Sequence, residues 1–154
     1  MGSYFLDTSA IVKCYFPEQG HFWVANLCDP AQKHDLFISQ AALVEVIAAI
    51  CRKAREQNMQ IVRRDRTIDM FRADCANIYN RELVTESIYA NAGNLCRTYR
   101  LRAYDAVQLA CALSRRREAL ANRMALPIFV CADKKLAEFA SAEGLATDNP
   151  EHYQ

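Results

Sequence analysis

Short apolar runs separated by longer helical segments limit what this chain can fold into. Three runs are apolar along most of their length, as strands buried on both faces are: residues 3–6, 35–38 and 127–131. Longer segments with helical character lie between and after them: residues 40–57, 64–79, 85–99, 103–124 and 134–143. A last short strand is predicted over residues 145–147. Because strands that alternate with helices pair in parallel, we predict an α/β fold with helices on both faces of the sheet.

Capping residues predict where several helices begin. Thr8 or Ser9 is the predicted cap of a short helix after the first strand, and a second short helix is predicted over residues 21–28. Ser39 and Thr85 are the predicted caps of two longer helices. In each case a hydroxyl oxygen can accept a hydrogen bond from an N–H group of the first helical turn.

Length and composition indicate one globular domain over residues 1–154. An apolar fraction of 52% excludes general disorder, and a net charge of +1 gives no global attraction to nucleic acid. The seven cysteines form no C-x-x-C pair, which favours free thiols in a reducing, cytoplasmic environment. No apolar run approaches the roughly 20 residues that a membrane-spanning helix needs, so no membrane association is expected.

Four carboxylates lie in apolar segments of the sequence that are otherwise predicted to be buried. Asp7, Glu45, Asp105 and Asp133 are each the only charged residue in an apolar run of about ten residues or more. Asp7 and Asp133 follow predicted parallel strands, at the sheet edge where open α/β folds bind ligands. Glu45 and Asp105 fall in the first or second turn of long predicted helices.

A buried carboxylate needs a partner, and two kinds of partner are possible here. Taken singly, each acid suits a salt bridge, and Asp105 or Asp133 suits the positive end of a helix. Taken together, the four acids lack a lone Lys or Arg in the same apolar segments. The alternative is convergence on a divalent cation, because Mg²⁺ and Mn²⁺ prefer oxygen ligands.

Several other site chemistries have no support in the sequence. The three histidines lack zinc-ligand spacing, the four glycines form no phosphate-binding loop, and no G-x-S-x-G motif occurs. A phosphoaspartate enzyme with Asp7 as nucleophile is a closer rival. Such enzymes carry a second Asp two residues later, where this chain has Ser9.

The segments around the four acids resemble the conserved blocks of the PIN-domain nucleases, in the same order and over nearly the whole chain. They read FLDTSAIVKCY, ALVEVIAAI, RAYDAVQLACAL and FVCADKKLAEFASAEGLATDNP. The nearest subgroup is the VapC-type toxins of toxin–antitoxin modules. The resemblance implies a three-layer α/β/α sandwich with a short central parallel sheet. It also implies Mg²⁺- or Mn²⁺-dependent endoribonuclease activity, homodimers and a cognate antitoxin protein.

The resemblance also implies roles for individual residues. Asp7, Glu45, Asp105 and Asp133 are the expected catalytic acids, and Ser9 is a supporting hydroxyl. The chemistry of phosphodiester hydrolysis suggests how the four acids divide these roles: Asp7, Asp105 and Asp133 are the expected metal ligands, and Glu45 is expected to orient or deprotonate the attacking water. Some relatives have another acid two positions after the last Asp, where this chain has Lys135, so one-metal and two-metal chemistry both stay open.

Basic residues near the acids are the predicted contacts to RNA phosphates: Lys13, Arg102 and Lys134. The run Arg115–Arg117 lies farther along its helix and is predicted to be solvated surface or a partner contact. The alternative functions are a catalytically inactive PIN-like protein-binding module and a phosphoaspartate-type regulator. Retention of all four acids favours the nuclease.

Overall fold

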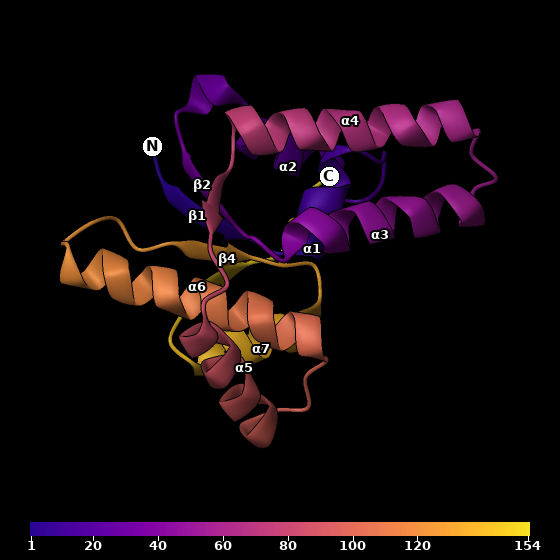
Figure 1. Ribbon diagram of the computed structural model, residues 1–154. Helices are drawn as coiled ribbons and strands as arrows, with labels where there is room; N and C mark the ends of the chain where they lie inside the picture. Colours follow the sequence, from indigo (N-terminus) through magenta and orange to yellow (C-terminus); the bar gives the residue numbers. More distant parts are fainter.

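The computed structural model describes residues 1–154 and has a central five-stranded parallel sheet between two layers of helices (Figure 1). The strands are β1 (Ser3–Leu6), β2 (Asp35–Ser39), β3 (Asn80–Glu82), β4 (Ile128–Val130) and β5 (Ala146–Asp148). They pair in parallel in the order β3-β2-β1-β4-β5. The chain adds β2 and β3 on one side of β1 and then β4 and β5 on the other, so the strand order reverses between β1 and β4. The predicted α/β/α architecture is confirmed.

Seven α-helices form the two outer layers. One layer holds α1 (Thr8–Ile11), α2 (His21–Leu27), α3 (Ala42–Glu56) and α4 (Ile61–Asn77). The other holds α5 (Glu86–Thr98), α6 (Ala103–Ala121) and α7 (Lys134–Ala142). Short 3₁₀ turns cover Val12–Cys14, Pro30–Gln32 and Pro150–His152. Figure 1 shows α3 and α4 side by side, on the opposite side of the sheet from α5, α6 and α7. None of these helices has both the length and the hydropathy that crossing a membrane requires.

The strands divide the core into two apolar clusters because alternate side chains point to opposite faces of the sheet. Leu6, Ile38 and Val130 pack with the layer that contains α3 and α4. Phe5 and Phe129 pack with α5, α6 and α7, and their rings stack with centroids 6.1 Å apart. All five side chains are fully buried, as predicted for strands covered on both faces.

Two predicted helix caps are wrong, and both errors have a local cause. Asp7, and not Thr8 or Ser9, caps α1, because its Oδ2 accepts a hydrogen bond from the Ser9 backbone N–H. Ser39 Oγ accepts from the Ala41 N–H at 3.1 Å, so the helix begins at Ala42 with Ala41 at its cap position. The predicted cap Thr85 is confirmed.

Strand β3 was not predicted, and the environment of Arg115 was predicted wrongly. The polar sequence of β3 carries no apolar pattern, and the strand is defined by backbone pairing to β2, in which Asn80 lies opposite Phe37. Arg115 is buried, not solvated: its Nη1 lies 3.5 Å from a Glu82 carboxylate oxygen. Its guanidinium also lies over the Phe37 ring, 4.7 Å from the centroid. A carboxylate and an aromatic face together allow the guanidinium to be buried.

Candidate active site

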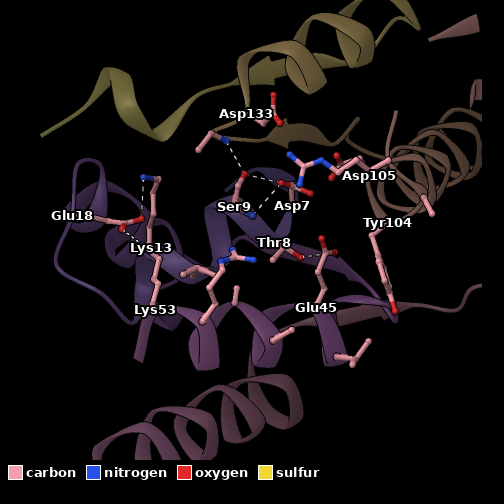
Figure 2. A pocket seen from close by; sticks show the side chains of 18 of the residues that line it. Asp7, Thr8, Ser9, Lys13, Glu18, Glu45, Lys53, Tyr104, Asp105 and Asp133 are labelled. Atoms are coloured by element: carbon pink, nitrogen blue, oxygen red, sulfur yellow. Dashed lines mark hydrogen bonds and ion pairs between the residues drawn. The ribbon is translucent and has the colours of Figure 1, made fainter. Parts of the chain in front are cut away.

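The four lone acids of the sequence line one cleft of about 600 Å³ at the carboxyl edge of the sheet. Asp7 follows β1 and Asp133 follows β4, the two strands that flank the reversal of strand order. Glu45 and Asp105 lie in the first turns of α3 and α6, which belong to opposite helix layers. Figure 2 shows the four side chains around the same space. The fold therefore brings acids from four separate segments together at the position where open α/β sheets bind ligands.

Asp7 is the most buried of the four acids, with 3% of its surface exposed. Its Oδ2 accepts hydrogen bonds from the Ser9 backbone N–H at 3.1 Å and from Ser9 Oγ at 2.6 Å. Ser9 Oγ in turn accepts from the Ala132 N–H at 2.9 Å. Oδ1 of Asp7 is buried and has no hydrogen-bond partner. One oxygen of this carboxylate is thus fixed by hydrogen bonds, and the other has no partner in the protein.

The surroundings of Asp7 disfavour its negative charge. Burial raises the pKa of Asp7 to about 6; the hydrogen bonds from Ser9 oppose this rise, and the charges of Glu45 and Asp105 add to it. A buried carboxylate of this kind is costly unless a cation is bound beside it.

Glu45 is held by two donors that sequence reasoning missed. Its Oε2 accepts from Thr8 Oγ1 at 2.9 Å and from Gln108 Nε2 at 2.9 Å. Gln108 is fully buried, one helical turn after Asp105 on α6. A lone amide within the apolar run that follows Asp105 was the sequence signal that could have revealed it.

Asp105 and Asp133 complete the acidic cluster. Burial raises the pKa of Asp105, and the charges of Glu45 and Asp133 raise it further, against the opposing effect of Arg102. Asp133 is exposed and caps α7, with Oδ1 accepting from the backbone N–H groups of Lys135 and Leu136 at 3.0 and 3.2 Å. Helix capping, considered for Asp133 from the sequence, is therefore present in addition to its place at the cleft.

Of the predicted phosphate contacts, Lys13 lines the cleft but already has partners. Only 3% of its surface is exposed, and its Nζ lies 3.2 Å from Glu18 Oε1 and 3.5 Å from Glu151 Oε1. Lys53, on the same side of the cleft, also pairs with Glu18 (Figure 2). A phosphate would have to compete with these carboxylates for either ammonium group.

The other cations near the cleft have no carboxylate within ion-pair distance. Arg102 is exposed, lines the cleft and lies directly before α6. Lys134 is exposed at the start of α7, outside the cleft lining. Arg52, which sequence reasoning did not single out, is exposed and lines the cleft on α3. It follows Glu45 by two helical turns, and this helical spacing was the available signal.

The donor atoms suit a hard divalent cation. All four acids offer oxygen, and Oδ1 of Asp7 has no other partner. No three His, Cys, Asp or Glu side chains are already arranged at the spacing that would hold a metal ion. Burial, with a further contribution from the neighbouring carboxylates, raises the pKa values of Asp7 and Asp105, and a cation bound among these acids would lower them.

A family model described as the PIN domain matches residues 4–141. The chain belongs to the PIN domain family. All four acids and Ser9 lie within the matched segment, whereas β5 and the final 3₁₀ turn lie beyond it. No curated protein sequence matches the chain.

Solved structures with the same fold include three toxin–antitoxin proteins. VapC20 of Mycobacterium tuberculosis, a toxin that cleaves the sarcin–ricin loop, is similar with a TM-score of 0.63 and 16% identity, over 94% of this chain and 97% of that one. A toxin–antitoxin complex from Klebsiella pneumoniae gives a TM-score of 0.58 and 17% identity, over 96% and 98%. VapBC2 of Rickettsia felis, bound to promoter DNA, gives 0.59 and 17%, over 95% and 97%. At these identities the likeness shows the fold.

The raised pKa of Asp7 predicts a pH-dependent stability. Because the folded-state pKa, about 6, exceeds the ordinary value of 3.8, the folded state binds the proton more tightly, and stability is lost as pH rises from about 4 to above 6. Asp7→Asn removes this loss. We expect the variant in EDTA buffer to be more stable than wild type by about 2 to 3 kcal/mol at pH 8, and not at pH 4.

Urea denaturation at the two pH values measures this difference. The exposed Asp69, substituted by Asn, is the matched control and should show no such pH dependence. A marked loss of stability in Asp7→Asn at pH 8 would mean that Asp7 is the partner of a structural salt bridge.

Proposed function

We propose that this chain is a Mg²⁺- or Mn²⁺-dependent endoribonuclease, with residues 1–154 as a single PIN-like nuclease domain, and that it is the toxin of a toxin–antitoxin pair. The observation that carries the proposal is the convergence of four acids on one cleft, with a buried Asp7 oxygen left unpartnered. Family membership and the toxins among the structural neighbours support it.

Each acid has a role that follows from its position. Asp7, Asp105 and Asp133 would hold the cation, which when bound would polarise the scissile phosphate and lower the pKa of a water molecule. Glu45 lies across the cleft with Oε2 engaged, so its Oε1 would accept the proton of the attacking water. Ser9 keeps Oδ2 of Asp7 engaged, which directs Oδ1 toward the cation.

The chain's own cations would draw the RNA backbone into the acidic cleft. Arg102 stands beside Asp105, and Arg52 lies about 10 Å from Glu45 along α3, at roughly 1.5 Å per residue. Both lack a carboxylate partner, so we propose that they meet phosphates before Lys13 does. Lys134, outside the cleft lining, stays a prediction for a more distant phosphate.

Metal dependence is the first test of the proposal. Wild type with Mg²⁺ or Mn²⁺ should cleave RNA, and EDTA should abolish cleavage. Asp7→Asn, Glu45→Gln, Asp105→Asn and Asp133→Asn should each lower the rate by on the order of 10²-fold or more, because each removes charge or a proton acceptor from the transition state.

Gel analysis of end-labelled RNA measures these rates. Glu138→Gln, an exposed substitution on α7, should leave the rate unchanged. Cleavage that persists in EDTA would contradict the metal mechanism. A wild-type protein that cleaves no RNA would support the alternative of an inactive protein-binding module.

Arg52 provides a second test, with a matched control on the same helix. In an Asp7→Asn background, which binds without cutting, Arg52→Gln should weaken RNA binding by about three- to tenfold. It should also reduce the slope of log affinity against log salt by about one, since one phosphate contact is lost. Arg55 is also exposed but lies outside the cleft lining, so Arg55→Gln should do less. RNA binding is measured by fluorescence anisotropy. If Arg52→Gln and Arg55→Gln weakened it equally, the RNA would not be bound in this cleft.

The proposed partner is an antitoxin that places an Arg or Lys among the four acids. Such a side chain would substitute for the cation and block the phosphate position. The toxin–antitoxin complexes among the neighbours support a protein partner, and the homodimer expected from the resemblance stays a prediction.

Competition between metal and partner tests this mode of inhibition. The probe is the protein encoded by the adjacent reading frame, with affinity measured by titration calorimetry. Saturating Mg²⁺ should weaken its binding to wild type, and less so to Asp133→Asn, which holds the ion poorly. An affinity that ignores both the metal and the substitution would place inhibition away from the site.

A further inference from the structure

The hydrogen bonds of Glu45 are unevenly divided between its two carboxylate oxygens. Oε2 accepts from Thr8 Oγ1 and from Gln108 Nε2, both at 2.9 Å, and Oε1 has no partner in the protein. Gln108 Nε2 also donates to Thr8 Oγ1 at 3.1 Å, which closes a triangle of three side chains. The triangle fixes one oxygen of the acid and leaves the other without a partner; Figure 2 shows the bond from Thr8 to Glu45.

The three corners of this triangle come from three helices and both helix layers. Thr8 begins α1, Glu45 lies on α3, and Gln108 lies on α6, across the sheet edge from α3. Thr8 directly follows Asp7, and Gln108 lies one turn beyond Asp105. The same hydrogen bonds therefore set the position of Glu45 relative to two other acids of the site.

The burial of Gln108 has a cost that packing alone does not explain. Its side chain is fully buried, and its Oε1 has no hydrogen-bond partner. An unsatisfied buried acceptor is destabilising, and a Leu or Met of similar size would avoid that cost. An amide at this position gives what an apolar side chain cannot, which is a donor directed at Glu45.

We propose that Thr8 and Gln108 are positioning residues for Glu45: they hold Oε2 so that Oε1 faces the water that attacks the phosphate. This inference rests on the proposed function and deepens it. Hydrogen bonds to an ionised acceptor are short and strong, and a proton acceptor is effective only within a narrow range of positions. Neither residue contacts the reacting atoms in this assignment.

The test uses substitutions that keep shape and remove donors. Gln108→Met and Thr8→Val should each slow single-turnover RNA cleavage by about 10- to 100-fold, with RNA affinity within about twofold of wild type. Thr8→Ser, which keeps the hydroxyl, should restore most of the rate. The double variant should be little slower than either single variant, because both act through the same oxygen.

Ser39→Ala is the matched control, since Ser39 is also a fully buried hydroxyl near the start of α3 and does not line the cleft. It should leave the rate near that of wild type. Gln108→Met or Thr8→Val at wild-type rate would overturn the inference. The inference would also be overturned if Thr8→Ser cleaved RNA as slowly as Thr8→Val. It would likewise be overturned if the cleavage rates of the variants fell only in proportion to their melting temperatures.

A second readout does not need cleavage. Crystal structures of Thr8→Val and Gln108→Met should show the Glu45 carboxylate in a different rotamer or in two conformations. An unmoved Glu45 in both variants would overturn the inference. If wild type cleaves no RNA, the proposed function fails, and these two structures still decide whether Thr8 and Gln108 hold Glu45 in place.

Discussion

The Ser9 hydroxyl joins the ends of the two strands on which the site depends. It donates to Oδ2 of Asp7 at 2.6 Å and accepts from the Ala132 N–H at 2.9 Å. Because β1 and β4 are neighbours in a parallel sheet, one hydroxyl can fasten both carboxyl ends at the same edge. Asp7 follows one strand and Asp133 the other, so this bond also fixes the distance between the segments that carry them. The other two acids of the cleft, Glu45 and Asp105, lie beside this junction between the ends of β1 and β4.

Placing acids at such a junction lowers the stability of the folded state. Burial and the neighbouring carboxylates raise the pKa values of Asp7 and Asp105, which means that ionisation works against folding without a cation. The fold tolerates this because the two apolar clusters on either side of the sheet are continuous and well buried. A bound divalent cation would favour the ionised carboxylates, so the groups whose ionisation opposes folding are those that are proposed to bind the ion.

The sequence was sufficient to predict those site residues that differ sharply in polarity from their neighbours along the chain. A single charge in an apolar run is visible without any coordinates, and for this reason Asp7 and Glu45 could be predicted to share a site. Strand β3 could not be predicted, because its pairing to β2 is a long-range backbone interaction that leaves no apolar pattern. Arg115 appeared to belong to a solvated basic run, since nothing in the sequence shows that Glu82 and Phe37 lie beside it. Gln108 was missed because a single amide in an apolar helical run is a weaker signal than a lone charge, although it stands in the run that follows Asp105.

The charges that line the cleft divide into two groups with different partners. Lys13 and Lys53 are matched by Glu18 and Glu151, and this group forms a neutral wall on one side. The remaining lining charges are the four acids and the two unpaired arginines. Four negative charges against two positive ones leave an excess that repels a polyanion at close range. A bound divalent cation would offset that excess and so reduce the repulsion of a phosphate. The charge of the cleft is therefore a physical reason to connect a cation with the proposed RNA substrate.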